Sequence, residues 1–173
     1  VMVPCVLKGK KIPCLIPLAI DQDPHFRVAR DVYPKLGYPK PAIIHGMFLP
    51  PLTGLDEGKM SSSNANVAII TTDTPDEVKK KINKYAFSGG RDTLEEHRKL
   101  GGNPDIDVCF QYLKFLFEPD DKKLKKIHDD YKSGKMTTGE LKAYTIEKIN
   151  AFLKTHQKKR EEAKRQIEKF LYK

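Results

Sequence analysis

Long apolar runs and clusters of metal-binding side chains are both missing from this sequence. The apolar stretch 14–20 is far shorter than the roughly 20 residues that a membrane-spanning helix requires, and no signal peptide is visible. Three cysteines leave an odd thiol, and no two Cys or His residues have the close spacing of a zinc site. We therefore expect a cytoplasmic protein with free thiols, no membrane partner and no bound metal.

The phosphate-binding loop of the P-loop NTPases is missing too. That loop needs four residues between its glycines and a Ser or Thr directly after its lysine. Here three residues separate Gly54 from Gly58, and a methionine follows the lysine. The pentapeptide 59–63 still places a cation beside several hydroxyl donors, which suits a nucleotide phosphate. A solvated serine-rich turn is the alternative that this cluster alone leaves open. The pentapeptide consists of Lys59, Met60, Ser61, Ser62 and Ser63.

The first part of the chain has the pattern of an α/β fold. Residues 14–20 form a continuous apolar run with β-branched side chains, as in a strand buried on both faces of a parallel sheet. A helix capped by Asp23 should follow, and residues 42–44 can form a second strand. Asp21 and Gln22 then lie where the first strand ends, at the edge where open α/β sheets bind ligands. The 59–63 loop is delivered to the same edge.

Beyond residue 74 the sequence predicts only helices. Capping boxes at 74–77, 92–95 and 137–140 mark three helix starts. Further helices are expected around 108–116, from residue 120 or 121 to about Gly134, and from 137 through Leu171. Residues 120–173 hold 16 Lys and Arg against nine Asp and Glu, so this segment carries +7 of the net charge of +9. Such an excess fits a polyanionic partner, although a solvated helix face has the same pattern.

Several segments resemble those of the tryptophanyl-tRNA synthetases of the eukaryotic cytosolic type, within the class I aminoacyl-tRNA synthetases. The pentapeptide 59–63 resembles the second class I signature. Ala-Ile-Asp-Gln-Asp-Pro at 19–24, Tyr-Pro-Lys-Pro at 38–41 and Ala-Phe-Ser-Gly-Gly-Arg-Asp-Thr at 86–93 follow in the order of the family. The resemblance runs from about residue 12 nearly to the end of the chain.

Two departures from the family are visible. The other class I signature, a HIGH-type motif, has no match, and the chain begins at Val1. The resemblance therefore implies the carboxyl-terminal part of a longer enzyme. After residue 63 the sequence Asn64-Ala65-Asn66 replaces the usual continuation of the family, which bears on the conformation of the loop.

The resemblance implies a fold and a reaction. Residues 1–74 would be the C-terminal part of a Rossmann-type parallel-sheet catalytic domain, and residues 75–173 an all-helical anticodon-binding domain. The enzyme would activate tryptophan with ATP, accompanied by Mg²⁺, to tryptophanyl-adenylate and transfer the acyl group to tRNA(Trp). The resemblance also implies a homodimer once the catalytic domain is complete.

The resemblance assigns roles to individual residues. In the catalytic loop, Lys59 would stabilise the departing pyrophosphate beside the three serines, and Met60 would anchor the loop in an apolar pocket. The expected ATP-binding residues are Asp21, Lys59, Met60 and Ser61. Gln22 would bind the amino-acid substrate, and Arg91 with Asp92 would contact the tRNA anticodon.

Some alternatives remain open at this point. Asp21 can simply cap the turn that follows it, and Asp92 can simply cap a helix. The chain by itself can also be a tRNA-binding module without chemistry of its own. An unrelated basic RNA-binding protein with a chance Lys-Met-Ser loop is the remaining possibility.

Overall fold

The structure, a computed structural model, describes residues 3–55, 60, 67–169 and 171. The chain divides into two compact units, Val1–Phe48 and Leu49–Lys173, and each is described by itself. Within the described ranges, no helix is both long enough and apolar enough to cross a membrane.

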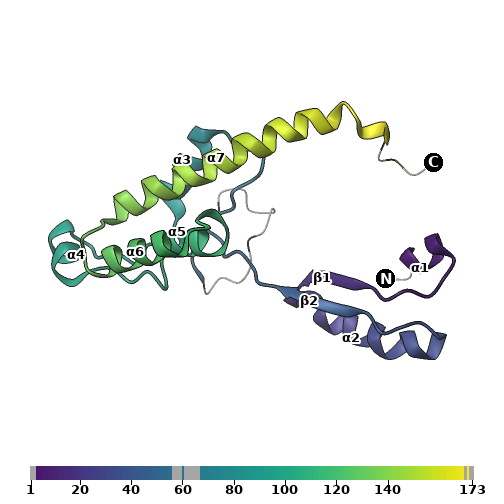
Figure 1. The fold of residues 1–173 in the computed structure, drawn as a ribbon. Helices are drawn as coiled ribbons and strands as arrows, with labels where there is room; N and C mark the ends of the chain where they lie inside the picture. Colours follow the sequence, from purple (N-terminus) through teal and green to yellow (C-terminus); the bar gives the residue numbers. More distant parts are fainter. Residues whose placement is uncertain (1–2, 56–59, 61–66, 170, 172–173) are drawn as a thin grey trace. The chain divides into compact units, whose positions relative to one another are not determined.

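The first unit is a two-stranded parallel sheet with helices. The strands pair from Leu15 opposite Ala42 to Ala19 opposite Gly46, so both strands end at the same edge. Gly37, with φ of 74°, ends the helical run after the first strand, because this left-handed conformation favours glycine. The elements in order are α1 (Val3–Lys8), β1 (Leu15–Ala19), η1 (Ile20–Gln22), α2 (Asp23–Val32), η2 (Tyr33–Leu36) and β2 (Ala42–Gly46) (Figure 1).

Two predictions for this unit need correction. The strand forms where the sequence predicts it, but none of its five residues is buried, because the sheet has only two strands in the described chain. Asp23 does not cap α2: the N-cap is Gln22, and Asp23 is the first helical residue. The carboxylate of Asp23 instead accepts hydrogen bonds from Arg27 and His45.

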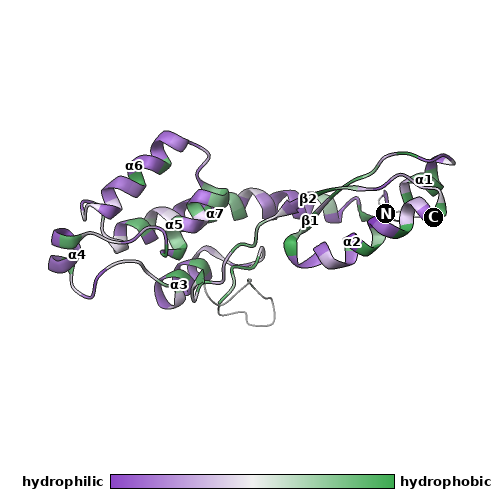
Figure 2. Cartoon of the chain, turned by 90° about the horizontal axis from the view of Figure 1, so that it is seen from below, coloured by the Kyte–Doolittle hydropathy of each residue, from purple (hydrophilic) through white to green (hydrophobic). Residues whose placement is uncertain are grey.

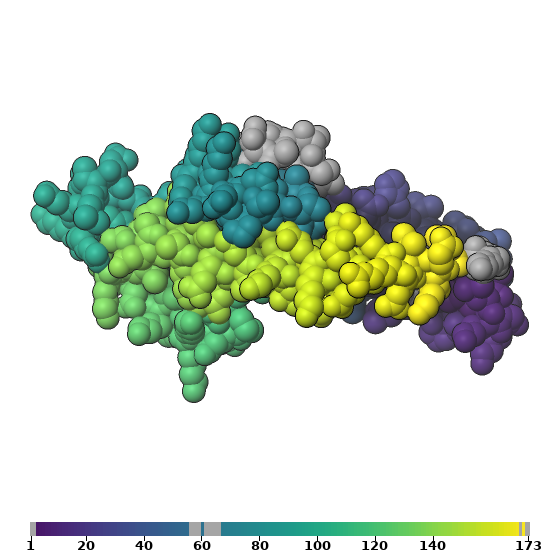
Figure 3. Space-filling view, turned by 90° about the horizontal axis from the view of Figure 1, so that it is seen from above, coloured from purple at the N-terminus to yellow at the C-terminus, as the bar shows by residue number. Residues whose placement is uncertain are grey.

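The second unit contains only helices among its described regular elements, as predicted for the chain beyond residue 74. Figure 1 shows α3 and α5 beside the long helix α7, and the space-filling view shows α3 lying along it (Figure 3). The elements are α3 (Pro75–Tyr85), α4 (Leu94–Leu100), α5 (Val108–Tyr112), the π-helix η4 (Leu113–Phe117), α6 (Asp121–Lys132), α7 (Thr138–Lys164) and η5 (Ile167–Lys169).

The core of this unit forms around one face of α7. Buried residues recur every four positions along the helix, so they line one side of it. They pack against buried side chains of α3, α5 and α6, and each fully buried Leu or Ile contributes about 1.5–3 kcal/mol. Hydrophilic residues make up most of α6 (Figure 2), which agrees with the charged composition of this part of the chain. The four residues of α7 are Leu141, Thr145, Ile149 and Leu153.

Helix capping follows the sequence prediction at two of three positions. Thr74 with Glu77 and Thr137 with Glu140 form the predicted capping boxes. The third is shifted by one residue, since Thr93 rather than the preceding aspartate caps α4. The last helix ends at Lys164, before the predicted residue 171.

The segments on either side of residues 56–66 belong to the helical unit. The Tyr112 hydroxyl donates to the carbonyl of Pro50 at 2.8 Å, and the Phe87 amide donates to the carbonyl of Leu52 at 2.7 Å. Lys81 donates to the carbonyl of Ala68 at 3.1 Å. Residues 49–55 and 67–74 therefore pack with the helices, while a functional domain boundary near residue 74 stays a prediction.

Candidate functional site

A pocket of about 320 Å³ lies between the segment 91–97 and the start of α7. Its wall contains Arg91 and Asp92, the two residues with a predicted role in tRNA binding. The α7 side contributes hydroxyl groups and the first backbone amides of a 27-residue helix, which point towards the helix end. The lining residues are Arg91, Asp92, Thr93, Leu94, His97, Thr137, Thr138 and Gly139.

The Asp92 carboxylate is not used as a helix cap. Thr93 takes that role, and its hydroxyl accepts a hydrogen bond from the amide of Glu96 at 3.2 Å. Within the described chain, no side chain forms a hydrogen bond or ion pair with the Asp92 carboxylate, which is exposed. The interpretation of Asp92 as only a cap is therefore wrong, and its carboxylate stays available to a ligand at the pocket.

A backbone carbonyl group holds the side chain of Arg91 in place. Its Nε donates to the carbonyl of Gly101 at 3.1 Å, which fixes the stem of the side chain against the end of α4. Arg98 on the same helix donates to the carbonyl of Gly134 at 3.0 Å, in the turn just before α7. The first bond holds Arg91 against the end of α4, and the second holds α4 against the turn before α7.

A directional chain of hydrogen bonds lies behind the pocket. The hydroxyl of Tyr131 donates its only proton to Asp107 Oδ2 at 2.9 Å, so it accepts from the Thr138 hydroxyl at 3.1 Å. Ser88 in turn donates to Thr138 at 3.3 Å and accepts from the Gly90 amide at 3.0 Å. The chain connects the 88–91 loop with α6, α7 and the start of α5. Burial and the nearby Asp107 carboxylate raise the pKa of Tyr131, so its hydroxyl keeps its proton at neutral pH.

Asp107 is the acceptor at the end of this chain. It is 1% exposed and also accepts from the backbone amides of Gly89, Cys109 and Phe110, at 2.9, 2.9 and 3.3 Å. Burial, followed by the Asp107 charge, raises the pKa of Cys109 to about 12, so this thiol is an inert core group.

The buried ring of His97 forms the floor of the pocket. Its Nε2 donates to the carbonyl of Met136 at 2.9 Å. Among the described residues, no group forms a hydrogen bond with the buried Nδ1, and the ring packs against Tyr131 with 5.1 Å between centroids. His97 thus holds α4 against the segment that leads into α7.

The two glycines before Arg91 allow the loop to approach this network. A Cβ on Gly89 would lie 1.9 Å from the carbonyl oxygen of Asn103, and one on Gly90 would lie 2.2 Å from the hydroxyl oxygen of Thr138. Both distances are far below van der Waals contact. A side chain at Gly90 would push the Arg91 loop away from the start of α7, and one at Gly89 would push it away from the backbone at Asn103.

A second group of predicted site residues lies at the edge of the two-stranded sheet. Asp21 and Gln22 occupy η1, directly after β1, and both are exposed. His45, in β2, lies with its Nε2 2.8 Å from Asp23 Oδ1. Partial burial alone would raise the pKa of Asp23, but the hydrogen bonds from Arg27 and His45 hold it below its ordinary value. The structure therefore places two of the residues with predicted contacts, Asp21 and Gln22, at the carboxyl edge of the strands.

Most of the predicted catalytic loop, Lys59 and Ser61 to Ser63, lies outside the described residues. Met60 is described: its amide donates to the carbonyl of Leu49 at 3.3 Å, and its side chain packs against the core, as the anchoring prediction requires.

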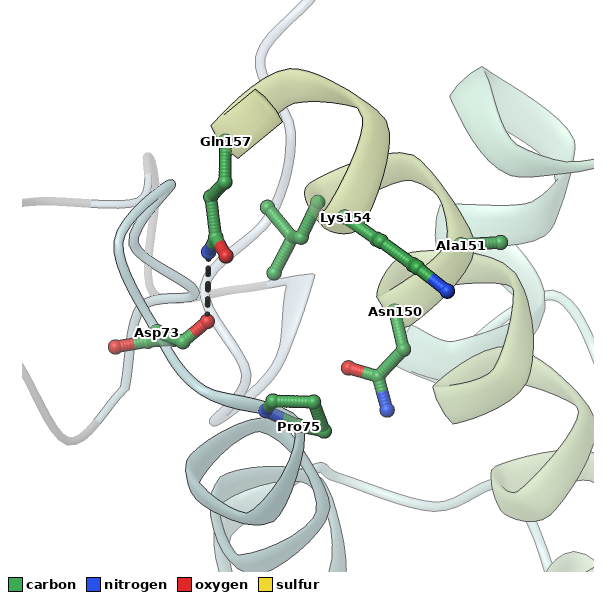
Figure 4. A pocket seen from close by; sticks show the side chains of 7 residues that line it. Asp73, Pro75, Asn150, Ala151, Lys154 and Gln157 are labelled. Carbon is green, nitrogen blue, oxygen red and sulfur yellow. Dashed lines mark hydrogen bonds between the residues drawn. The ribbon is translucent and has the colours of Figure 1, made fainter. Parts of the chain in front are cut away.

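A hollow of about 300 Å³ separates the start of α3 from α7, and Figure 4 shows Gln157 reaching across it to Asp73. Gln157 Nε2 donates to the carbonyls of Thr71 and Asp73, both at 3.0 Å, which ties this segment to α7.

Metal ligands do not cluster in the described part of the chain. No three His, Cys, Asp or Glu side chains there come together as a ligand set.

The family of tRNA synthetases class I (W and Y) matches residues 8–154. The chain belongs to this family. A tryptophan–tRNA ligase of Sulfurisphaera tokodaii is 60% identical over 94% of the chain and 42% of that protein. A cytoplasmic tryptophan–tRNA ligase of Homo sapiens is 55% identical over 91% of the chain and 33% of that protein. The predicted resemblance is thereby confirmed, and the chain spans less than half the length of these relatives.

Solved structures of class I synthetases share the fold. A tryptophanyl-tRNA synthetase from Giardia lamblia matches with a TM-score of 0.80 and 50% identity, over 86% of the chain and 36% of that structure. A product-bound parasite tRNA synthetase matches with a TM-score of 0.83 and 49% identity, over 88% and 40% of the two chains. The class I fold, with a parallel sheet and helices, is thus confirmed.

Sequence reasoning missed the residues that complete the Arg91 pocket. Thr138 and Gly139 lie 47 and 48 positions after Arg91 in the sequence, and no motif around His97 marks it as a pocket residue. The capping box at Thr137 located the start of α7 but gave no sign of its partner. The two adjacent glycines were the available signal, since paired glycines before an arginine favour a close approach of backbones.

Proposed function

We propose that this chain is part of a tryptophan–tRNA ligase that activates tryptophan with ATP and transfers the tryptophanyl group to tRNA(Trp). The observation that carries the proposal is the identity of 52–60% to ligases of that name over at least 93% of the chain in the archaeal and yeast relatives. Identity at this level over nearly the whole chain supports a common reaction as well as a common fold.

The proposed division of labour follows the chain. Residues 1–74 would be the C-terminal part of the Rossmann-type catalytic domain, and residues 75–173 the anticodon-binding domain. At the sheet edge, Asp21 would contact ATP and Gln22 the tryptophan substrate. Lys59, with the hydroxyls of the three serines that follow Met60, would stabilise the pyrophosphate as it departs. These interactions accelerate the reaction only if they strengthen in the transition state.

Magnesium has a limited place in this proposal. Mg²⁺ keeps most of its water and binds through one or two carboxylates together with substrate phosphates, so it would arrive with the triphosphate. Asp21 is the carboxylate among the proposed ATP contacts. The complete enzyme would be a cytoplasmic homodimer that pairs through the catalytic domain, as expected from the family.

The Arg91–Asp92 pocket supports anticodon recognition on chemical grounds. The free carboxylate of Asp92 can accept from the amino group of cytosine, and the Arg91 guanidinium can stack on a base or donate to it. Single-stranded loops are the usual targets of such readout, because their bases are accessible. A cavity of about 320 Å³ suits one nucleotide better than a duplex.

A tRNA-binding module without chemistry is the second candidate. It is favoured by one observation: every residue that lines the Arg91–Asp92 pocket lies within Leu49–Lys173, a compact unit of its own. Joining the chain to the amino-terminal remainder of the Sulfurisphaera tokodaii ligase separates the two candidates. Tryptophan-dependent exchange of pyrophosphate into ATP by the chimera supports the ligase. Anticodon-dependent tRNA binding without exchange, in a chimera that is folded, supports the module.

Anticodon recognition is tested by titrating the chain with tRNA(Trp) and with the same tRNA carrying a changed anticodon, at two salt concentrations. We expect the changed anticodon to bind more weakly at both. Asp92→Asn should relax discrimination between cytosine and uracil, because the amide offers a donor as well as an acceptor. Asp105→Asn makes the same charge change at an exposed residue that does not line the pocket, and it serves as the control. Equal binding of both tRNAs that collapses with salt would mean only nonspecific attraction.

A further inference from the structure

A second cavity, of about 560 Å³, lies between α6 and α7 and has a basic rim. Ile127, Met136 and Tyr144 provide apolar surface, and three lysines of α6 stand around it. Such a combination suits a ligand with both an apolar ring and a negative charge. The full lining is Asp120, Lys122, Lys123, Lys126, Ile127, Asp130, Met136 and Tyr144.

The acidic residues of the lining are already engaged within the protein. Asp120 caps α6, accepting from the amides of Lys122 and Lys123 at 2.9 and 3.2 Å. Asp130 forms an ion pair with Lys135 at 3.6 Å. In the part of the chain that the structure describes, neither Lys122 nor Lys126 has an acidic partner within 4 Å, and both are exposed. The two lysines lie four residues apart, hence on one face of α6, and leave uncompensated positive charge at the cavity.

The wall formed by Tyr144 is fixed by a buried carboxylate. The Tyr144 hydroxyl donates to Glu118, whose side chain is 3% exposed. Lys148 pairs with the same carboxylate at 2.9 Å, and Lys123 lies 4.8 Å from the centre of the tyrosine ring. The hydrogen bond from Tyr144, together with Lys148, lowers the pKa of Glu118 to about 2, so this anchor is charged at neutral pH. The cavity wall is thus formed before any ligand arrives.

The two cavities are neighbours along the chain. Met136 lines the α6–α7 cavity, whereas Thr137, the next residue, lines the Arg91–Asp92 pocket. His97 bonds to the carbonyl of Met136, so the segment between the cavities is held from the pocket side. The two cavities therefore lie on either side of one short segment of the chain.

We propose that the α6–α7 cavity binds a further nucleotide of the single-stranded anticodon loop, with its phosphate at Lys122 and Lys126. The proposal rests on the proposed tRNA recognition and adds a site to it. Phosphate contacts by lysine supply affinity without sequence information, and an adjacent apolar wall accepts any base. The cavity should therefore strengthen and orient binding, while Arg91 and Asp92 select the anticodon.

The test uses the 173-residue chain and a tRNA(Trp) anticodon stem-loop. The double variant Lys122→Ala/Lys126→Ala removes the free charges at the cavity, and Lys79→Ala/Lys80→Ala on α3 removes the same charge from exposed positions elsewhere in the unit. We expect about tenfold weaker binding for the cavity variant, with a salt slope reduced by roughly 1.4, as for two contacts to a single strand. The control should lose less than about threefold.

Methylphosphonate substitution, which removes one phosphate charge at a time, locates the contact. The proposal is supported if one methylphosphonate weakens binding to the wild-type chain but not to the cavity variant. That position should differ from the positions affected by Arg91→Ala. Anticodon discrimination should be unchanged in the cavity variant. If discrimination is present but no phosphate couples to the two lysines, the cavity proposal is wrong and the proposed function stands. If the wild-type chain does not discriminate anticodons, both fail.

Discussion

Replacement of Asp107 should destabilise the helical unit and disturb the Arg91–Asp92 pocket together. This buried carboxylate accepts four hydrogen bonds, from three backbone amides and the Tyr131 hydroxyl. Asp107→Ala would leave these donors unsatisfied in the interior. A buried donor without a partner costs about 1–3 kcal/mol, and loss of an N-cap typically costs about 1 kcal/mol.

The four costs do not add fully. Tyr131 also contacts Ser88 and Thr138, so its hydroxyl can redirect its proton, and water can enter the space that the carboxylate leaves. We therefore expect Asp107→Ala to lower the free energy of unfolding by about 3–5 kcal/mol. Asp107→Asn keeps one acceptor for the cap of α5 but turns an NH₂ group towards the Gly89 amide or Tyr131, so it should cost about 1–3 kcal/mol.

Urea unfolding of the chain, followed by circular dichroism, measures these losses. Loss of the Asp107 cap of α5 should leave the urea m-value unchanged, because the folded state stays compact. Asp105→Asn, two positions away and exposed, should change stability by less than about 0.5 kcal/mol. A loss below about 1 kcal/mol for Asp107→Ala would refute the reasoning, because it would mean that the four donors find equivalent partners elsewhere.

Three further perturbations have defined outcomes. Glu118→Gln should destabilise the chain at neutral pH. The difference from wild type should shrink as pH falls from 4.5 towards 2, because the stability that comes from the depressed pKa of Glu118 is lost as this carboxylate protonates. A constant difference in urea midpoints across this range would contradict the assignment. Gly101→Ala should lower Tm strongly, since φ is +72° and the new Cβ would lie 1.8 Å from the Lys132 carbonyl oxygen; a Tm within about 3 °C of wild type would count against it. In the chimeric ligase, Lys59→Ala should slow pyrophosphate exchange far more than it weakens tryptophan binding, and equal losses would remove the assigned role.

Local signals in the sequence located most helix starts because capping is a local event. The boxes at Thr74 and Thr137 involve residues three positions apart, so the sequence contains all that determines them. The start of α4 was displaced by one residue because both Asp92 and Thr93 are good N-caps with a glutamate three positions later. Only the loop geometry, fixed by Gly89 and Gly90 against distant backbone and side-chain oxygens, selects the threonine.

The predicted burial of the first strand failed for a different reason. An apolar run such as 14–20 predicts the surface that a strand can bury, and burial itself depends on the strands and helices that lie beside it. With two strands in the described sheet, Leu15 is 61% exposed. The sequence pattern therefore indicates more covering structure than these residues contain.

The pocket at Arg91 depends on contacts that no local pattern contains. Thr138 is the first residue of α7, and its hydroxyl matters here because Gly90 comes close enough for the Ser88 side chain to reach it. That approach depends in turn on Asp107, which holds the Gly89 amide from a third segment. One displaced residue in this set changes the position of Arg91 relative to the start of α7. Arg91 and Asp92 can therefore discriminate between anticodons only if the hydrogen-bond chain behind them is complete. The Asp107 variants test this directly. Asp107→Asn, measured well below its Tm, should lose anticodon discrimination before it loses overall affinity for tRNA.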